Sequence, residues 1–161
     1  MENDLIRFGA KVCSKEYLEM SAQAEDNKPT LEQFDAWGKR QDKLTTSEGW
    51  RYLKREAAIE GLTHLPYHTM DANPNARLHQ IVKLMMFQPS SAMVSCPLAM
   101  TDGAAFTLRE LKSTPYWNKQ LEEAFNHVTS NDPASHWTSG QWMTEKRGGS
   151  DVTRGTDTVA I

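Results

Sequence analysis

Cysteine, long apolar runs and excess charge are all scarce in this sequence, and each scarcity excludes a class of protein. Its two cysteines, Cys13 and Cys96, form no CxxC pair. A small secreted domain held by disulfides needs more, so we expect a reduced, intracellular setting in a compartment that the sequence leaves open. No apolar stretch approaches the roughly 20 residues that span a bilayer. Because Asp4, Arg7 and Lys11 also interrupt the N-terminus before a signal-peptide core develops, we expect no membrane partner.

The charge balance gives no support for nucleic-acid binding. Eighteen basic and 21 acidic residues give a formal net charge of -3. A surface that neutralises phosphates along a duplex requires a basic stripe, so we expect no nucleic-acid partner through this region. Taken alone, the length suits one soluble domain, which typically buries about 70% of its unfolded surface.

Helical periodicity dominates the first part of the chain. Residues 5–20 carry a loose apolar pattern that Ser14 interrupts as a new N-cap, and residues 25–30 form a polar loop. Thr45 and Glu48 have the capping-box spacing, in which hydroxyl and carboxylate satisfy opposing backbone amides. We therefore expect a helix from this point, ended or kinked by Pro66.

Further helices are marked by prolines and capping residues. Asn73-Pro74 opens a helix with a buried apolar stripe, Pro89 kinks it, and Pro97 stops the helical piece that follows. The expected stripe consists of Leu78, Ile81, Val82, Met85 and Met86. Thr101-Asp102 is the expected cap of a further short helix.

The last expected helix and the change to strands define a domain boundary. Thr114-Pro115 opens this helix. Its inward positions are Tyr116, Leu121, Ala124, Phe125 and Val128. Asn131-Asp132-Pro133 is a turn cluster, after which the periodicity changes to that of strands at 137–144 and 152–161. The expected domains are therefore 1–133, helical, and 134–161, the first strands of a β-domain.

One segment carries chemical information. Residues 141–152 read QWMTEKRGGSDV, an apolar run that breaks into a charged turn, paired glycines and Ser-Asp. A strand end leaves backbone groups unpaired, glycines allow close approach, and the hydroxyls of Thr144 and Ser150 add hydrogen bonds, so the segment suits a flat cofactor. From the residues alone, an ordinary strand-turn-strand with a Gly-Gly bulge remains the alternative.

The string MTEKRGGSDV resembles the flavin-contacting signature of the acyl-CoA dehydrogenase superfamily, and Lys146 after Thr-Glu is most similar to its AidB-like branch. Two upstream stretches agree in order and spacing: residues 43–53, and SCPLAMT at 95–101. The resemblance implies a mainly α fold, namely an acyl-CoA dehydrogenase-like N-terminal helical domain followed by the first strands of the middle β-barrel domain. Members have a second helical domain, so the resemblance implies a fragment, truncated at its start and its end.

The resemblance also implies the site. Gln141 to Ser150 would wrap the isoalloxazine of FAD, with the backbone at Met143 and Thr144 meeting its pyrimidine edge. The implied FAD-binding residues are Gln141, Met143, Thr144, Gly149 and Ser150. Ser150 would also touch the acyl-CoA substrate. The complete protein would be a homo-oligomer.

No catalytic residue is expected in this chain, because the base that removes the α-proton comes from the second helical domain in this superfamily. The isolated chain is therefore expected neither to hold FAD tightly nor to turn over substrate. Two alternatives stay open: a non-catalytic helical interaction module, and a DNA-repair-associated protein, as the AidB-like branch suggests. Whether the complete protein is a dehydrogenase or an oxidase also stays open.

Three other groups of residues have ordinary explanations. Met93 and Val94 fall near the acyl tunnel that the resemblance implies, but a Met-rich stripe is usually core. His64 and His68 are four residues apart, yet Pro66 lies between them and no third ligand is near, so we expect no metal site. The helix glutamates are expected to face solvent. These are Glu16, Glu19, Glu56 and Glu60.

Overall fold

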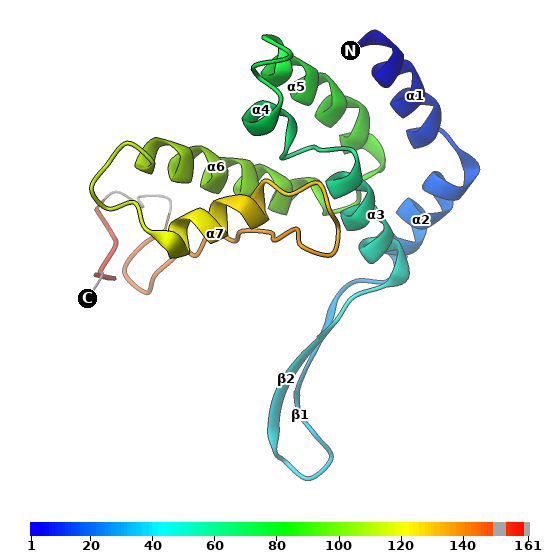
Figure 1. Cartoon of the computed structure of the whole chain (residues 1–161). Coiled ribbons are helices and arrows are strands. Elements are labelled where there is room, and N and C mark those ends of the chain that lie inside the picture. The colour runs from blue at the N-terminus through cyan, green and yellow to red at the C-terminus, as the bar shows by residue number, and fades with distance from the viewer. Residues whose placement is uncertain (150–153, 160–161) are drawn as a thin grey trace.

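A computed structural model describes residues 1–149 and 154–159 and shows a helical body with one projecting hairpin (Figure 1). The helices are α1 (Glu2–Val12), α2 (Lys15–Asp26), α3 (Glu48–Ile59), α4 (Leu65–His68), α5 (Ala76–Phe87), α6 (Ser95–Leu111) and α7 (Lys119–Val128), with a 3-10 turn, η1, at Gln88–Ser90. The strands are β1 (Thr30–Phe34) and β2 (Arg40–Thr45). The expected mainly α class is confirmed.

Serine caps begin α2 and α3. The Ser14 hydroxyl accepts a hydrogen bond from the Tyr17 amide at 3.3 Å, as its position in the sequence predicts. The Ser47 hydroxyl accepts from the Trp50 amide at 3.2 Å, so the cap of α3 lies two residues beyond the expected Thr45. Gly61, at φ +66°, ends this helix. Pro66 therefore does not end it, and instead lies in the first turn of α4.

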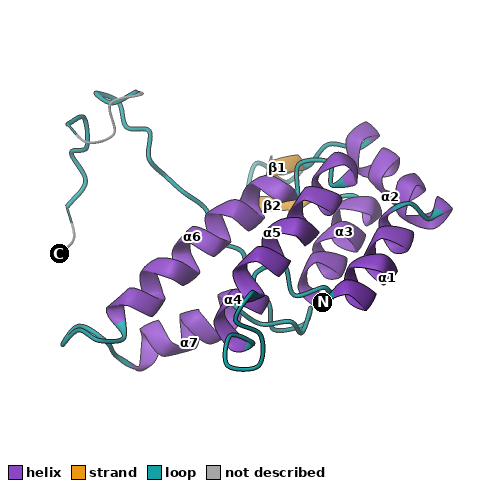
Figure 2. Ribbon diagram, turned by 90° about the horizontal axis from the view of Figure 1, so that it is seen from above, coloured by secondary structure: helices purple, strands orange, loops and turns teal. Residues whose placement is uncertain are grey.

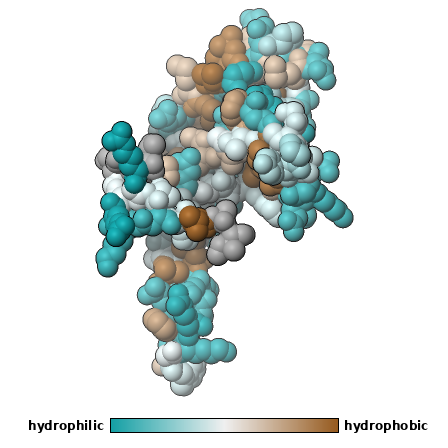
Figure 3. Space-filling model, turned by 90° about the vertical axis from the view of Figure 1, so that its left-hand side faces the viewer, coloured by the Kyte–Doolittle hydropathy of each residue, from teal (hydrophilic) through white to brown (hydrophobic). Residues whose placement is uncertain are grey.

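The β-hairpin formed by β1 and β2 was not predicted from the sequence. β1 and β2 pair antiparallel, with Leu31 opposite Leu44 and Glu32 opposite Lys43, and every residue of both strands is exposed. Figure 3 shows apolar residues on the outside of this hairpin, at the bottom of the view. Neither face of the hairpin is buried, so the alternation that would have revealed it is weak.

The second half of the helical body differs from expectation in its helix starts. Pro97 lies in the first turn of α6, where a proline is tolerated, and α6 continues past Thr101 and Asp102 without a break. The α7 helix begins at Lys119, and its N-cap is Asn118, which accepts hydrogen bonds from two backbone amides. Thr114 is therefore not its cap. The α6 and α7 helices lie side by side and antiparallel (Figure 2).

The inner face of α5 is mixed, and the expected stripe is only partly correct: Phe87 and Ala76 are buried and Met86 packs against the core. Leu78, Ile81 and Met85 are exposed, whereas His79 and Lys83 are buried. In α7, Phe125 and Val128 are buried as predicted, but Tyr116 precedes the helix and is exposed.

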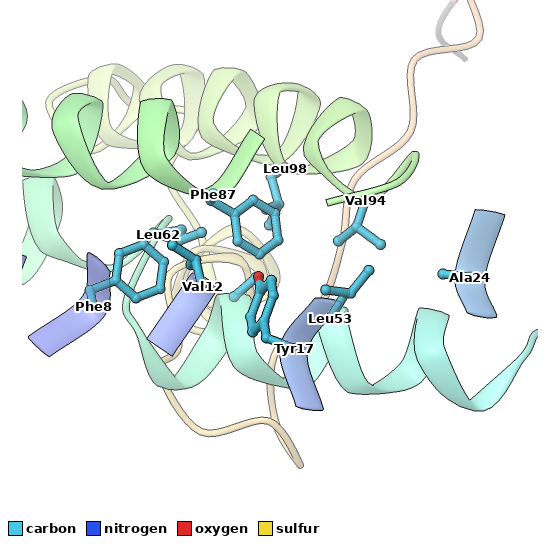
Figure 4. Packing of buried hydrophobic residues seen from close by; sticks show 10 residues of the cluster. Phe8, Val12, Tyr17, Ala24, Leu53, Leu62, Phe87, Val94 and Leu98 are labelled. Atoms are coloured by element: carbon cyan, nitrogen blue, oxygen red, sulfur yellow. The ribbon is translucent and has the colours of Figure 1, made fainter. Parts of the chain in front are cut away.

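The core lies where α1, α2, α3, α5 and the start of α6 meet (Figure 4). Phe87 and Tyr17 face each other at its centre, with ring centroids 6.4 Å apart in an edge-to-face arrangement. The fully buried members also include Phe8, Leu53 and Leu62. The core therefore joins residues that are far apart in the sequence.

A buried ion cluster lies beside this core and corrects the expectation for two glutamates. Glu56 and Glu60 are 5% and 4% exposed, whereas Glu16 and Glu19 face solvent as expected. Glu60 accepts hydrogen bonds from Arg7, Lys11 and Lys83, and Lys11 also pairs with Glu56. Asp4 accepts from Lys83 and His79, both at 3.0 Å. Neither buried glutamate is therefore an unpaired charge.

The chain beyond α7 turns at Asn131-Asp132-Pro133, as predicted, and then runs without regular structure. Residues 137–144 form no strand, and neither do 154–159; the other residues of the second expected strand lie outside the described part. A strand needs a partner for its backbone groups, and no described strand lies beside this segment.

Candidate functional site

The segment with the candidate site residues runs along α6. The Ser139 amide donates a 3.0 Å hydrogen bond to the Thr101 hydroxyl, which itself donates to the Pro97 carbonyl at 2.6 Å within the helix. Thr101 is fully buried, so it fixes the point at which the segment meets α6. Thr101 was expected to cap a helix, but it lies inside α6 and holds this segment, a role that its sequence position does not reveal.

A shallow hollow of about 510 Å³ lies between α6 and this segment. Gln141 and Ser139 line it from the segment, and one face of α6 lines it from below, with residues three and four apart. The α6 residues are Met100, Gly103, Ala104, Thr107 and Leu108. Four of these five side chains are apolar or absent, so the hollow suits an apolar group.

Four of the five candidate FAD-binding residues are described, and all four are exposed: Gln141, Met143, Thr144 and Gly149. Ser150, the fifth candidate and the expected substrate contact, lies outside the described residues. No backbone group of residues 141–144 hydrogen-bonds to another described residue. A row of donors and acceptors without a partner among the described residues fits the edge of a flat heterocycle such as a flavin.

Glu145 closes the turn that follows. Its backbone carbonyl accepts from the Gly148 amide at 3.0 Å, and its carboxylate accepts from the amides of Asp157 and Thr158 at 2.6 and 3.2 Å. Hydrogen bonds from Thr158 and Asp157 lower the pKa of this carboxyl below its usual range. Glu145 therefore ties residues 157 and 158 to the turn, a role that its place between Thr144 and Lys146 did not reveal.

Val94, His64 and His68 belong to the packing, whereas Met93 does not. Val94 is buried in the core, while Met93 is exposed outside it. The rings of His64 and His68 stack at 4.5 Å. His64 Nδ1 contacts the Thr129 carbonyl at 2.8 Å, and His68 Nε2 contacts the Thr129 hydroxyl at 2.7 Å. Both histidines thus hold the C-terminus of α7 against α4.

Comparison with known proteins identifies the family. The family described as "Adaptive response protein AidB N-terminal domain" matches residues 1–129. The chain belongs to this family. Acyl-CoA dehydrogenase family member 11 of Caenorhabditis elegans is 47% identical over 98% of this chain, and the putative acyl-CoA dehydrogenase AidB of Escherichia coli (strain K12) is 28% identical over 92%. The chain spans only 25% and 28% of these two relatives.

Two solved structures share the fold. Caenorhabditis elegans ACDH-11 in complex with C11-CoA has a TM-score of 0.84 and 43% identity over 98% of this chain and 27% of its own. The apo form of Bd2924 has a TM-score of 0.76 and 41% identity over 86% of this chain and 26% of its own. The chain therefore matches about a quarter of the length of each of these two structures, as the resemblance to a longer protein implied. No helix among the described residues is long and apolar enough to cross a membrane.

Proposed function

We propose that this chain supplies the N-terminal helical domain, residues 1–133, and the start of the flavin-binding domain, residues 134–161, of an FAD-dependent acyl-CoA dehydrogenase-like oxidoreductase. Family membership and the names of the two relatives support this class of protein. The observation that carries the proposal is the row of backbone groups at 141–144 that have no partner among the described residues and lie next to the apolar hollow over α6.

FAD would be held by backbone groups of Met143 and Thr144, with the Thr144 hydroxyl and the Gln141 side chain adding hydrogen bonds. Gly149 has no other atom within 4 Å of the position a Cβ would take, so its backbone is open to a ligand. When bound, the flavin would supply the acceptor for the hydride that leaves the β-carbon of an acyl-CoA. The role of this chain is to position the flavin.

We assign no catalytic base to this chain. The buried carboxylates of the described part, Glu56 and Glu60, are ion-paired inside the helical body. The ACDH-11 structure is a complex with C11-CoA, which supports an acyl-CoA thioester as the substrate class. Ser150 is the proposed substrate contact, and the working protein is proposed to be a homo-oligomer.

A chimera tests the proposal. It joins residues 1–161 of this chain to the remaining three-quarters, roughly, of the Caenorhabditis elegans relative. We expect the chimera to retain FAD through gel filtration, and an acyl-CoA to bleach the flavin absorbance under anaerobic conditions. The isolated chain is expected to retain little FAD, because it supplies only one side of the site.

A threonine pair provides the matched control. Thr144→Val in the chimera removes the hydroxyl and keeps the shape, so we expect FAD binding to weaken about 3- to 10-fold, the value of one hydrogen bond. Thr138→Val, at another exposed threonine of the same segment, should leave FAD binding unchanged. A folded chimera that elutes without flavin would contradict the proposal.

A helical interaction module is the second candidate, and the exposed apolar face of α5 favours it. The two candidates differ at residues 141–149, because an interaction module has no need of a flavin contact. If the chimera folded but retained no FAD, the interaction module would become the better explanation.

A further inference from the structure

A second pocket lies away from the proposed flavin segment, between α3 and the turn after α7. Its volume is about 170 Å³. Figure 1 shows the chain after α7 passing beside α3 at this point. The lining residues are Arg51, Lys54, Arg55 and Ala58 of α3 with Pro133 and His136 of the turn. The pocket depends on residues up to 136 only.

The charge of this pocket is positive, with no carboxylate in its lining. Arg51, Lys54 and Arg55 are three and four residues apart, so they share one face of α3. Neither Arg51 nor Lys54 pairs with a carboxylate in the described part of the chain; Arg51 donates only to the Thr46 carbonyl. Arg55 lies 3.4 Å from the Glu56 carboxylate. Two cations are therefore available to a ligand.

His136 is the polar residue that the turn adds to the lining, and it is 7% exposed. Its Nδ1 lies 3.0 Å from the Ser130 carbonyl, an acceptor only, so Nδ1 carries a proton and donates. Its Nε2 is buried and has no partner among the described residues. A buried nitrogen without a partner is costly, and a ligand in the pocket would relieve that cost.

We propose that this pocket binds a phosphate group, held by Arg51, Lys54 and the Nε2–H of a protonated His136. Two cations and a third N–H donor match the charge and acceptors of a phosphate, and charge-assisted bonds of this kind are the strong ones. Either free phosphate or the phosphate monoester of a larger molecule such as coenzyme A supplies this chemistry. The inference does not depend on the proposed flavin site.

Proton uptake accompanies binding. Burial lowers the pKa of His136, and nearby Lys54 lowers it further against the opposing effect of the Ser130 carbonyl, so the ring is neutral in the empty pocket at neutral pH. The charged groups around it are Arg51, Lys54 and Arg55 of α3 and Asp132 of its own turn. An anion raises this pKa, and affinity therefore falls as pH rises.

Histidine-detected NMR on this chain tests the proposal. Inorganic phosphate should shift the His136 ring signals, and sodium chloride at equal ionic strength should not. Sulfate, whose charge is constant between about pH 5 and 8, should bind about tenfold more weakly at the upper end of this range. The Lys54→Gln variant should weaken phosphate binding about tenfold, whereas Lys39→Gln, on the exposed hairpin turn, should not weaken it.

A His136→Asn variant gives a second check, because its amide can replace the Nδ1–H donor to Ser130 while Nε2 is lost. It should abolish the pH dependence of sulfate binding. Equal shifts with chloride, or equal affinities of the Lys54 and Lys39 variants, would overturn the proposal. Competition by coenzyme A but not by dephospho-coenzyme A would identify a nucleotide 3′-phosphate as the source, and competition by neither would identify free phosphate.

Discussion

Glu60 caps the C-terminus of α3 and accepts hydrogen bonds from cations of α1 and α5, so it joins these three helices. Arg7 donates to it at 2.8 Å, and Lys11 and Lys83 donate at 2.9 Å. Burial by itself would raise the pKa of this carboxyl, but the three bonds outweigh burial and hold the pKa far below its usual range. Because the Glu60 side chain is 1% exposed, water cannot replace a lost partner.

Glu60→Gln should therefore destabilise the chain strongly. The variant keeps the size of the side chain but removes the negative charge that pairs with Arg7, Lys11 and the buried Lys83. We expect this to lower the free energy of unfolding by about 3–5 kcal/mol. Urea unfolding at neutral pH measures this loss. Glu19→Gln, at an exposed glutamate 3.7 Å from Lys15, should change stability by less than about 0.5 kcal/mol. Equal effects of the two substitutions would contradict the assignment.

Gly49 allows α2 and α3 to approach closely. A Cβ at this position would lie 2.8 Å from the Ala24 amide nitrogen and would collide with the Met20 carbonyl, both backbone atoms that cannot turn aside. We expect Gly49→Ala to cost about 1–3 kcal/mol or more. Gly103→Ala in α6 meets nothing within 4 Å and should stabilise by about 0.5–1 kcal/mol. Thermal unfolding of both variants would show opposite shifts, and a stabilised Gly49→Ala would be inconsistent with this packing.

At the scale of elements, α5 shows why periodicity alone misassigned a face. Apolar residues lie on both its inner and outer sides, so the pattern establishes a helix but not which of these residues face inward. The inward positions of His79 and Lys83 depend on Asp4, at least 75 residues away in sequence, and on Glu60, 23 residues from Lys83. Such long-range ion pairs leave no local signal. The capped starts at Ser14 and the turn at 131–133 were predictable because their hydrogen bonds are local.

The hairpin is the element that we expect to be least stable. An isolated two-stranded hairpin is marginal in water, and none of the β1 and β2 residues is buried against the body. The strand amides should therefore exchange with solvent deuterium orders of magnitude faster than the amides of α3, which carries the buried Leu53 and Ala57. Hydrogen exchange followed by mass spectrometry measures the difference. Protection of the strands equal to that of α3 would show that the hairpin is anchored.

The candidate site remains a prediction, and the contacts that hold its segment in place could not be predicted. The residue types at 141–149 predict a cofactor segment, since glycines, hydroxyls and a strand-like run have a local meaning. Its attachment to α6 depends on the Ser139 amide and the Thr101 hydroxyl, which are 38 residues apart, and the closure at Glu145 uses backbone amides 12 and 13 residues later. A single sequence shows no spacing pattern that would reveal contacts between such distant positions.

At the scale of the whole molecule, acid acts on two sets of groups in the same direction. Burial lowers the pKa of His68 and of His136 from the usual 6.5, so the unfolded chain binds more protons than the folded one once pH falls below that value. The carboxyls of Asp4 and Glu60 also have lowered pKa values, because hydrogen bonds from Arg7 and Lys83 outweigh burial. The stability that these carboxyls contribute is fully present when the pH is above their usual pKa values of 3.8 and 4.5. It is lost as the pH falls through their lower pKa values in the folded chain.

We therefore expect the free energy of unfolding to be highest near neutral pH and to fall in two steps, a shallow one below about pH 6.5 from the histidines and a steep one below about pH 4.5 from the ion cluster. Urea unfolding followed by helical circular dichroism from about pH 7.5 to 3 measures both. Buffers free of phosphate and sulfate keep His136 unliganded during the series. Glu60→Gln should flatten the lower step and leave the upper one intact. A rise in stability between about pH 7 and 5 would contradict the sign of the histidine contribution, because it would require the folded chain to bind more protons than the unfolded one.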